Sequence, residues 1–355
     1  MELLALQGLF ETHKNVLAVA NILPKHKNIY VKGLQGSSPA VFAAALHHKM
    51  NDCFLYILND QESAGYFYHD LCQILGSEDV LFFPSAYKRA IKYGQTDAAN
   101  EILRTEVLGK IQADDKKYII ISYPEALAEK VVSKDILIKN TIHLKANEEI
   151  DRNFVSEMLD SFGFQYVDYV YEPGQYAIRG SILDVFSFSY EFPYRIDFFG
   201  DEVETIRNFD LESQLSKEKF NEIRIVPEFG RNSAKNASLF GLLPAGSVIG
   251  TEDMRWIASR VESINEDELH IDPKDEEFVK ADLLSKIDFM ESIHSFRQIR
   301  FDNKMLNTPD AVISFNTSMQ PPYHKNFDLL SESLHRFTDE GYTIYILSDS
   351  EKQQK

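Results

Sequence analysis

The chain has 355 residues, 44% of them hydrophobic and 26% charged, which is typical of a globular protein of two or three domains rather than a disordered one. The chain has 37 basic and 55 acidic residues and a formal net charge of −18, so its surface as a whole is unsuited to binding along a phosphate backbone. This net charge does not exclude a small local basic patch. No apolar run is long enough for a membrane span, so we expect a cytoplasmic protein without membrane contacts. Cys53 and Cys72 lack metal-ligand spacing, and we expect buried thiols and no metal site.

The first third of the sequence alternates between strand and helix patterns. Strands are predicted over residues 28–32, 53–58, 80–83 and 118–122, and helices over 39–49, 62–75 and 97–112, the first with Ser38 as N-cap. The run over 53–58 is apolar throughout, as expected for a strand that is covered on both faces. This rhythm predicts a parallel sheet with helices on both sides.

The middle of the sequence changes character. A predicted helix over 148–162 precedes three strand-like segments at 166–171, 176–188 and 194–209, with turn signals at 172–174 and 191–193. Adjacent short strands with tight connections predict an antiparallel meander, and therefore an α+β insert.

The last third returns to a mixed pattern. A strand is predicted over 247–249, a helix over 275–297, a strand over 311–315, a helix over 327–341 and a strand over 342–347. The final helix and strand look like the first units of another α/β domain.

A glycine-containing segment follows the first strand, at the place of a phosphate-binding loop with the pattern G-x-x-x-x-G-K-S/T. Gly33 matches the first glycine, but Ser38 stands at the second, Pro39 at the lysine and Ala40 at the hydroxyl residue. Pro39 supplies neither a cation nor an N–H for a phosphate. We interpret the segment, which includes Gly36, as an ordinary strand-to-helix turn or a degenerate loop, neither of which binds nucleotide.

A helicase-type ATPase also needs an acidic pair after a hydrophobic strand, to hold Mg²⁺ and position water. After residues 247–250, Thr251 stands where the metal-facing acid belongs. Glu252 and Asp253 follow it, and we interpret them as solvated charges or as N-terminal acids of a helix through Trp256.

Two stretches are distinctive: YEPGQYAIRGSILDVF at 171–186 and PYRIDFFGDEVETIR at 193–207. Together they resemble a pattern shared by the transcription-repair coupling factor (Mfd) family and the excision-repair helicase subunit UvrB. The resemblance is clear over about 135–230, weaker in the flanks and faint after about 300. Degenerate ATPase motifs favour the coupling factor family, as does a short segment at 84–95 with only Tyr87 and Tyr93 where the helicase has an aromatic-rich hairpin.

Side chains alternate along the strand that starts at Tyr194, so Arg195, Asp197 and Phe199 share one face. Phe199 either packs under a neighbouring element, with Arg195 and Asp197 as a surface ion pair, or is exposed for a partner. The resemblance implies that the meander docks UvrA and that Arg179, Arg195 and Phe199 make the contact. Asp184 and Asp197 either join that contact or hold the arginines in place.

The resemblance implies an α/β fold with a split, degenerate helicase-like (P-loop NTPase-like) sheet module. Its first half is expected over 1–134 and its second half over 226–325, around the inserted UvrA-binding domain at 135–225. Residues 326–355 are expected to start a further, truncated α/β domain.

For function, the resemblance implies the N-terminal region of a coupling factor, which recruits UvrA to a lesion-stalled RNA polymerase without ATPase activity of its own. ATP and Mg²⁺ are expected only at motor domains beyond residue 355, and RNA polymerase and DNA at regions absent here. The C-terminal domain of a full-length protein is expected to cover the UvrA face at rest. The alternatives are an ATP-dependent, UvrB-like helicase or translocase subunit, and a DNA-binding module.

Overall fold

The computed structural model describes residues 3–86, 98–113, 116–229, 235–269, 282–301, 308–319, 322–324 and 326–344. The chain divides into two compact units, Met1–Asn316 and Thr317–Lys355. Within the described part, no helix is long and apolar enough to cross a membrane.

The first part of the larger unit alternates helices and strands, as predicted. Its elements are α1 (Leu3–Glu11), α2 (Lys14–Ile22), β1 (Asn28–Lys32), α3 (Ser38–Met50), β2 (Phe54–Ile57), α4 (Gln61–Leu75), β3 (Val80–Phe82), α5 (Ala98–Ala113), β4 (Ile119–Ser122), α6 (Pro124–Ala128), β5 (Val131–Val132) and α7 (Lys134–Lys139). Later in the chain come β14 (Lys235–Ala237), the 3-10 helix η1 (Leu239–Leu242), β15 (Val248–Thr251), α9 (Met254–Leu269), α10 (Lys286–His294), β16 (Arg297–Arg300) and β17 (Ala311–Ser314).

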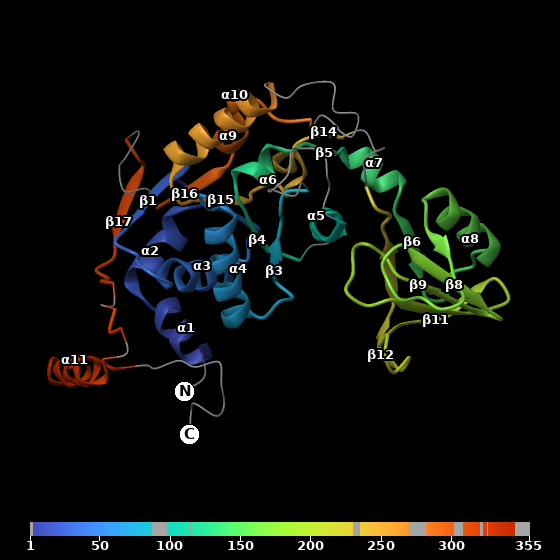
Figure 1. The fold of residues 1–355 in the computed structure, drawn as a ribbon, viewed down its shortest axis with the longest axis horizontal. Coiled ribbons are helices and arrows are strands. Elements are labelled where there is room, and N and C mark those ends of the chain that lie inside the picture. Colours follow the sequence, from blue (N-terminus) through green and yellow to red (C-terminus); the bar gives the residue numbers. More distant parts are fainter. Residues whose placement is uncertain are drawn as a thin grey trace. The chain divides into compact units, whose positions relative to one another are not determined.

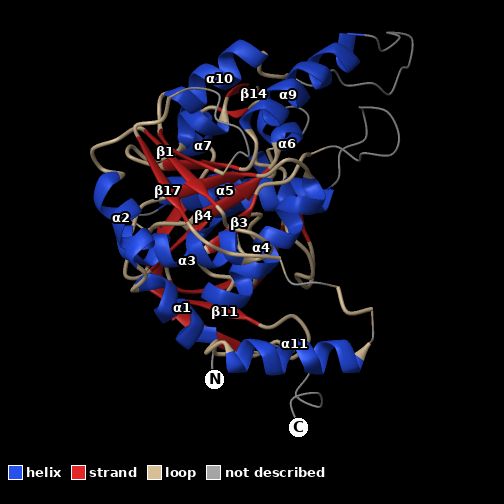
Figure 2. Cartoon of the chain, turned by 90° about the vertical axis from the view of Figure 1, so that its left-hand side faces the viewer, coloured by secondary structure: helices blue, strands red, loops and turns tan. Residues whose placement is uncertain are grey.

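Strands from both stretches form one seven-stranded sheet in the order β17-β1-β16-β15-β2-β4-β3, and each of its pairings is parallel. Every residue of β2, β4 and β15 is buried, because helices cover both faces of the sheet. Helices α1 to α4 lie on one side and α6, α9 and α10 on the other (Figures 1 and 2). The predicted α/β class with a parallel sheet is confirmed.

The helix predicted over 275–297 is confirmed over 286–294, where α10 lies, but not at 282–285 or 295–297, and residues 275–281 lie outside the described part. Residues 282–285 are not helical, and α10 begins only at Lys286, where the Ser285 hydroxyl accepts a hydrogen bond from the Asp288 amide. After α10 the chain enters β16, which pairs with both β1 and β15. Its sequence, RQIR, did not indicate a buried strand, yet Gln298 and Arg300 are 5% and 4% exposed.

The first predicted helix boundary also differs slightly. The N-cap of α3 is Ser37 rather than Ser38, and its side chain makes no capping hydrogen bond. Two helices that precede the first strand, α1 and α2, were not predicted.

The middle of the chain has a hydrophobic core of its own. Its elements are β6 (Ile142–Lys145), α8 (Arg152–Ser161), β7 (Gln165–Tyr166), β8 (Gln175–Arg179), β9 (Ile182–Val185), β10 (Tyr194–Phe199), β11 (Glu202–Phe209), β12 (Ser216–Phe220) and β13 (Glu222–Ile225). The six-stranded sheet has the order β12-β11-β10-β9-β8-β7 and is antiparallel from β8 to β12. The predicted meander is therefore confirmed.

Two predicted strands in this meander are each a hairpin. The segment 176–188 turns between β8 and β9 at Gly180, and the segment 194–209 turns between β10 and β11 at Gly200. The φ angles of these glycines are +62° and +65°, a backbone region that other residues rarely adopt. Of the strand predicted over 166–171, only Tyr166 is in a strand, as the second residue of β7.

In the smaller unit, α11 (Phe327–Asp339) confirms the predicted helix. Residues 342–344 are not in a strand, which contradicts that part of the predicted strand over 342–347. The remainder of that prediction lies outside the described residues.

Candidate functional sites

The alternation predicted for β10 is present in the structure. Tyr194, Ile196 and Phe198 are buried in the core between the sheet and α8. Arg195, Asp197 and Phe199 lie on the opposite face, which we call the outer face. Phe199 is 78% exposed, so the interpretation that it packs under a neighbouring element is wrong.

The pairing of β10 with β11 is irregular near the end of β10. It shifts after Asp197, so that Phe198 pairs with Val203 and Phe199 with Glu202. The extra residue, Glu204, is on β11, so β10 keeps its alternation, with Phe198 in the core and Phe199 in solvent at the end of the strand.

Asp184 on β9 is the centre of the charged cluster on the outer face. It is 1% exposed and pairs in register with Arg195. Arg195 Nε and Nη2 donate to the two carboxylate oxygens of Asp184 at 2.8 and 2.9 Å, and Arg179 also donates to Asp184. One buried carboxylate therefore holds both arginines that the family resemblance singles out, a geometry that guanidinium groups favour.

Each arginine is also supported by an aromatic ring. The guanidinium carbon of Arg195 lies 4.2 Å from the ring centre of Phe209, and that of Arg179 lies 4.9 Å from the ring centre of Tyr169. The side chain of Arg195 is 14% exposed and that of Arg179 is 34% exposed. Both charges are thus fixed in place and reach solvent only in part.

Asp197 has an equivalent internal role on the next strand. It pairs with Arg207 and accepts a hydrogen bond from the Thr205 hydroxyl at 3.0 Å. Asp184 thus holds Arg179 and Arg195 in place, which is one of the two roles considered, whereas Asp197 holds Arg207 instead.

Strand geometry places the three predicted contact residues within one patch. Arg179 pairs with Ile182, which pairs in turn with Asp197, so Arg179 lies two strands, roughly 10 Å, from Asp197. Phe199 lies about 13 Å from Arg195 along β10 at the usual rise per residue. Both separations fit within a standard-sized interface patch.

Tyr169 extends this region, and neither it nor the two exposed tyrosines beside it in the sequence were predicted. The exposed fractions of Tyr166, Tyr169 and Tyr171 are 56%, 53% and 63%. The guanidinium of Arg179 lies over the ring of Tyr169. Three tyrosines within six residues is the sequence signal that could have indicated an exposed aromatic surface, since tyrosine is enriched at interfaces.

The predicted degenerate loop lies between β1 and α3, at the carboxyl edge of the parallel sheet. Gly33 has a φ of +76°, and a Cβ atom there would lie 2.0 Å from the carbonyl oxygen of Phe315. The glycine is therefore required by the close approach of the chain after β17. That packing gives Gly33 a role that does not involve a phosphate.

Three amide groups of this loop are already bonded within it. The Gln35 amide donates to Ser38 Oγ at 2.7 Å, the Ser38 amide to the Gln35 carbonyl and the Ala40 amide to the Ser37 carbonyl. Pro39 has no amide hydrogen. The donors that would cradle a phosphate at a helix N-terminus are thus occupied or missing at these four positions.

The residues after β15 have separate structural roles. The Asp253 carboxylate accepts hydrogen bonds from the amides of Arg255 and Trp256 at 2.9 and 3.1 Å, which confirms Asp253 as an N-terminal acid of the helix. Glu252 is half-buried and accepts from the Asn59 amide at 3.0 Å, so it is not a solvated charge. Burial raises the pKa of the Glu252 carboxyl. Thr251 is fully buried.

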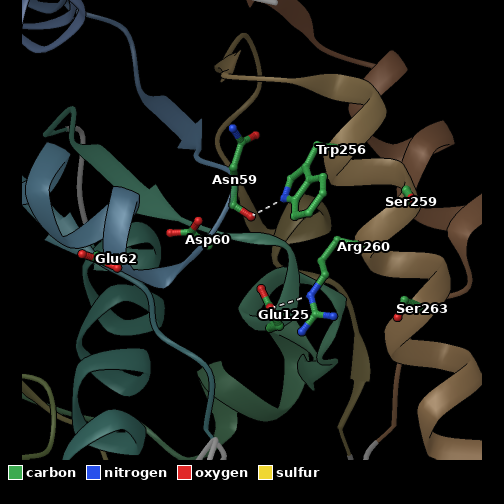
Figure 3. Close-up of a pocket in the computed structure, with 8 residues that line it drawn as sticks. All are labelled: Asn59, Asp60, Glu62, Glu125, Trp256, Ser259, Arg260 and Ser263. Carbon is green, nitrogen blue, oxygen red and sulfur yellow. Dashed lines mark hydrogen bonds and ion pairs between the residues drawn. The ribbon is translucent and has the colours of Figure 1, made fainter. Parts of the chain in front are cut away.

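Two cavities flank the residues that follow β2. The first, of about 340 Å³, lies beside the degenerate loop and is lined by Gly36, Pro39, Ala40 and eleven further residues. The second, of about 480 Å³, lies between Asn59–Asp60 and α9 (Figure 3). In it the Trp256 indole donates to the Asn59 carbonyl at 3.1 Å and Arg260 Nε donates to Glu125 at 2.8 Å.

Comparison with known families identifies the class of the middle region. Residues 142–229 match the family model described as the UvrB interaction domain. This range starts at β6 and extends just past β13, so the match includes the meander with its outer face.

The chain is related to transcription-repair coupling factors, and the resemblance seen in the sequence is confirmed. It is 27% identical to that of Escherichia coli (strain K12) over 195 residues, 55% of this chain and 17% of the relative. It is 30% identical to that of Rickettsia bellii over 49% of this chain and 15% of the relative. The match to that of Staphylococcus aureus (strain bovine RF122 / ET3-1) is 24% identical over 91% of this chain and 26% of the relative.

The chain thus spans about a sixth to a quarter of the length of these relatives. Among solved structures, Bacteroides Pif1 bound to single-stranded DNA matches with a TM-score of 0.16 and 9% identity, which is too low to support an inference.

Proposed function

We propose that the chain serves transcription-coupled repair by recruiting UvrA through the outer face of its middle domain. The observation that carries this proposal is an exposed phenylalanine, Phe199, beside two arginines that a buried aspartate holds in place. The match of the same region to the UvrB interaction domain supports it.

The physical properties of this face suit a partner-binding surface. Arg179 and Arg195 are already ordered by Asp184, so binding would immobilise little additional side-chain freedom. A guanidinium has five N–H donors. Arg195 also donates to Gln214 and Arg179 to the Asp168 carbonyl, and the donors left over can bind carboxylates or carbonyls of a partner. Phe199 offers an apolar side chain that a partner would remove from water.

In the larger process, the chain would bring UvrA to an RNA polymerase stalled at a lesion. RNA polymerase, DNA, ATP and Mg²⁺ would be bound by other regions of a longer protein, as would a C-terminal domain that covers the outer face at rest. The presence of coupling factors among the relatives supports this assignment.

A binding measurement with purified UvrA tests the proposal. We expect saturable binding that Arg195→Ala weakens by about 30-fold, the effect of removing an interface anchor of about 2 kcal/mol. The loss should shrink as salt rises, because it is partly electrostatic. Circular dichroism controls for the fold. The absence of binding by the unmodified chain would refute the proposal.

We further propose that this region has no ATPase activity, which separates it from a UvrB-like helicase subunit. The bonded loop amides and Pro39 support this. Labelled ATP with Mg²⁺ should show no saturable binding at millimolar concentrations. Saturable binding that disappears when Gly33 or Glu252 is substituted would overturn it.

A further inference from the structure

The cavity beside the degenerate loop lies at the position of a phosphate site, but its wall is aromatic and acidic. It lies where the carboxyl ends of β2, β15 and β16 meet, and its volume of about 340 Å³ is within the range of small-molecule sites. Its lining residues come from the loop, from α3 and α4, and from the ends of these strands. They are Gly36, Ser37, Pro39, Ala40, Tyr56, Ile57, Leu58, Ser63, Tyr66, Phe67, Asp70, Gly250, Glu252 and Phe301.

Aromatic rings form much of the wall. The ring centre of Tyr56 lies 5.3 Å from that of Phe67 and 6.4 Å from that of Phe301. Tyr66, on the same helix as Phe67, is 67% exposed at the edge. The Tyr56 ring also occupies the space above Gly250, where an added Cβ would lie 2.2 Å from it. Four rings around one cavity present several negative π faces to whatever enters.

The charge of the wall has one sign. Of the described residues that line the cavity, Asp70 and Glu252 are acidic and none is Lys, Arg or His. A phosphate would meet two carboxylates and no cation, whereas a cation would meet two carboxylates and several ring faces. The neighbouring cavity differs, because its wall includes Arg260, which is paired with Glu125.

One residue of the cavity wall also has an unsatisfied polar group. Tyr56 is 2% exposed, and its hydroxyl has no hydrogen-bond partner among the residues that the structure describes. A buried hydroxyl without a partner is unfavourable by about 1–3 kcal/mol, and a ligand N–H or O–H group could supply the missing bond. Burial also raises the pKa of the Glu252 carboxyl, and a cation bound beside it would offset that effect.

We propose that this cavity binds an organic ammonium ion, whose apolar body lies among Tyr56, Tyr66, Phe67 and Phe301 and whose charge faces Glu252 and Asp70. Cation–π contacts of this kind recognise alkylated ammonium groups. The position that resembles a polyphosphate site would thus select the opposite charge. The ammonium group could belong to a free small molecule or to a lysine-type side chain of a polypeptide.

Calorimetry or ligand-observed NMR on the whole chain would test this with choline and with its uncharged isostere 3,3-dimethylbutan-1-ol. We expect choline to bind at least about tenfold more tightly than the isostere, since a desolvated cation–π contact and a carboxylate each favour the charge. The second cationic probe is Nα-acetyl-lysine amide, whose side-chain ammonium group is free. Tighter binding of choline would assign the site to a free ammonium compound, and tighter binding of the lysine derivative to a polypeptide side chain.

Two variants and a matched control locate the binding. Glu252→Gln keeps an oxygen for the Asn59 amide and should weaken choline binding about tenfold, whereas Tyr66→Ala removes an exposed ring and should weaken it several-fold. Glu62→Gln, an exposed position on α4 outside this cavity, makes the same change in net charge and should have no effect. Equal binding of choline and the isostere, or no binding of either cationic probe, would overturn the proposal.

Discussion

The outer face of the middle domain and the degenerate loop both hold their polar groups in internal hydrogen bonds, with opposite consequences. Arg195 gives two N–H groups to Asp184 and two to Gln214 and still has one left, because a guanidinium carries five. A backbone amide has only one N–H, so the amides of Gln35, Ser38 and Ala40 have none left once they are bonded inside the loop. Internal bonding thus preorganises a surface made of arginines and closes an anion site made of amides.

The largest effect is expected at Asp184, on which the outer face depends. Asp184→Ala would leave Arg179 and Arg195 without their shared carboxylate in a partly buried setting. We expect a loss of about 3 kcal/mol in the free energy of unfolding, the lower end for breaking a buried ion pair. Urea denaturation measures it, and Asp197→Ala, at a position 19% exposed, should be less damaging. A change under about 1 kcal/mol for Asp184→Ala would show that the arginines are held by other contacts.

Restoring the lysine that the loop lacks tests whether its bonded amides prevent ATP binding. Pro39→Lys returns a cation and an amide hydrogen, but the neighbouring amides stay bonded and Glu252 and Asp70 stay in the cavity wall. We expect no measurable ATP binding at millimolar concentration with Mg²⁺. If this one substitution created an ATP site, the occupied amides would not be the reason for its absence.

The weakest binding is expected for DNA. A net charge of −18 leaves few sites for counterion release, so any DNA binding should be weak and should disappear between about 50 and 200 mM salt. A gel shift across that range measures it. A tight complex that persists at the higher salt would favour the DNA-binding alternative.

The sequence predicted the parallel sheet well because two of its central strands are apolar runs, at residues 53–58 and 118–121. It failed at β16, where Arg297, Gln298 and Arg300 occupy a central strand through tertiary partners that local pattern does not reveal. Gly180 and Gly200 divide what looked like long strands, since one glycine inside an alternating pattern is a weak turn signal unless its φ angle is known.

For the outer face, alternation predicted that Arg195 and Phe199 share a side, and the structure places them so. The pattern did not predict that Asp184 holds both arginines, because this depends on the register of three strands. The sequence pattern also could not predict the cavity beside the loop, since the aromatic rings that line it come from separate parts of the chain. Whether Arg179, Arg195 and Phe199 contact UvrA remains a prediction.

The most direct test of the central claim compares two exposed phenylalanines of the middle domain. Phe199 is 78% exposed on the outer face and Phe154 is 54% exposed on α8, which packs against the other side of the sheet. We expect Phe199→Ala to weaken UvrA binding about 30-fold with little dependence on salt, and Phe154→Ala to leave it unchanged. Equal affinities of the two folded variants and the parent chain would place the interface elsewhere and contradict the account.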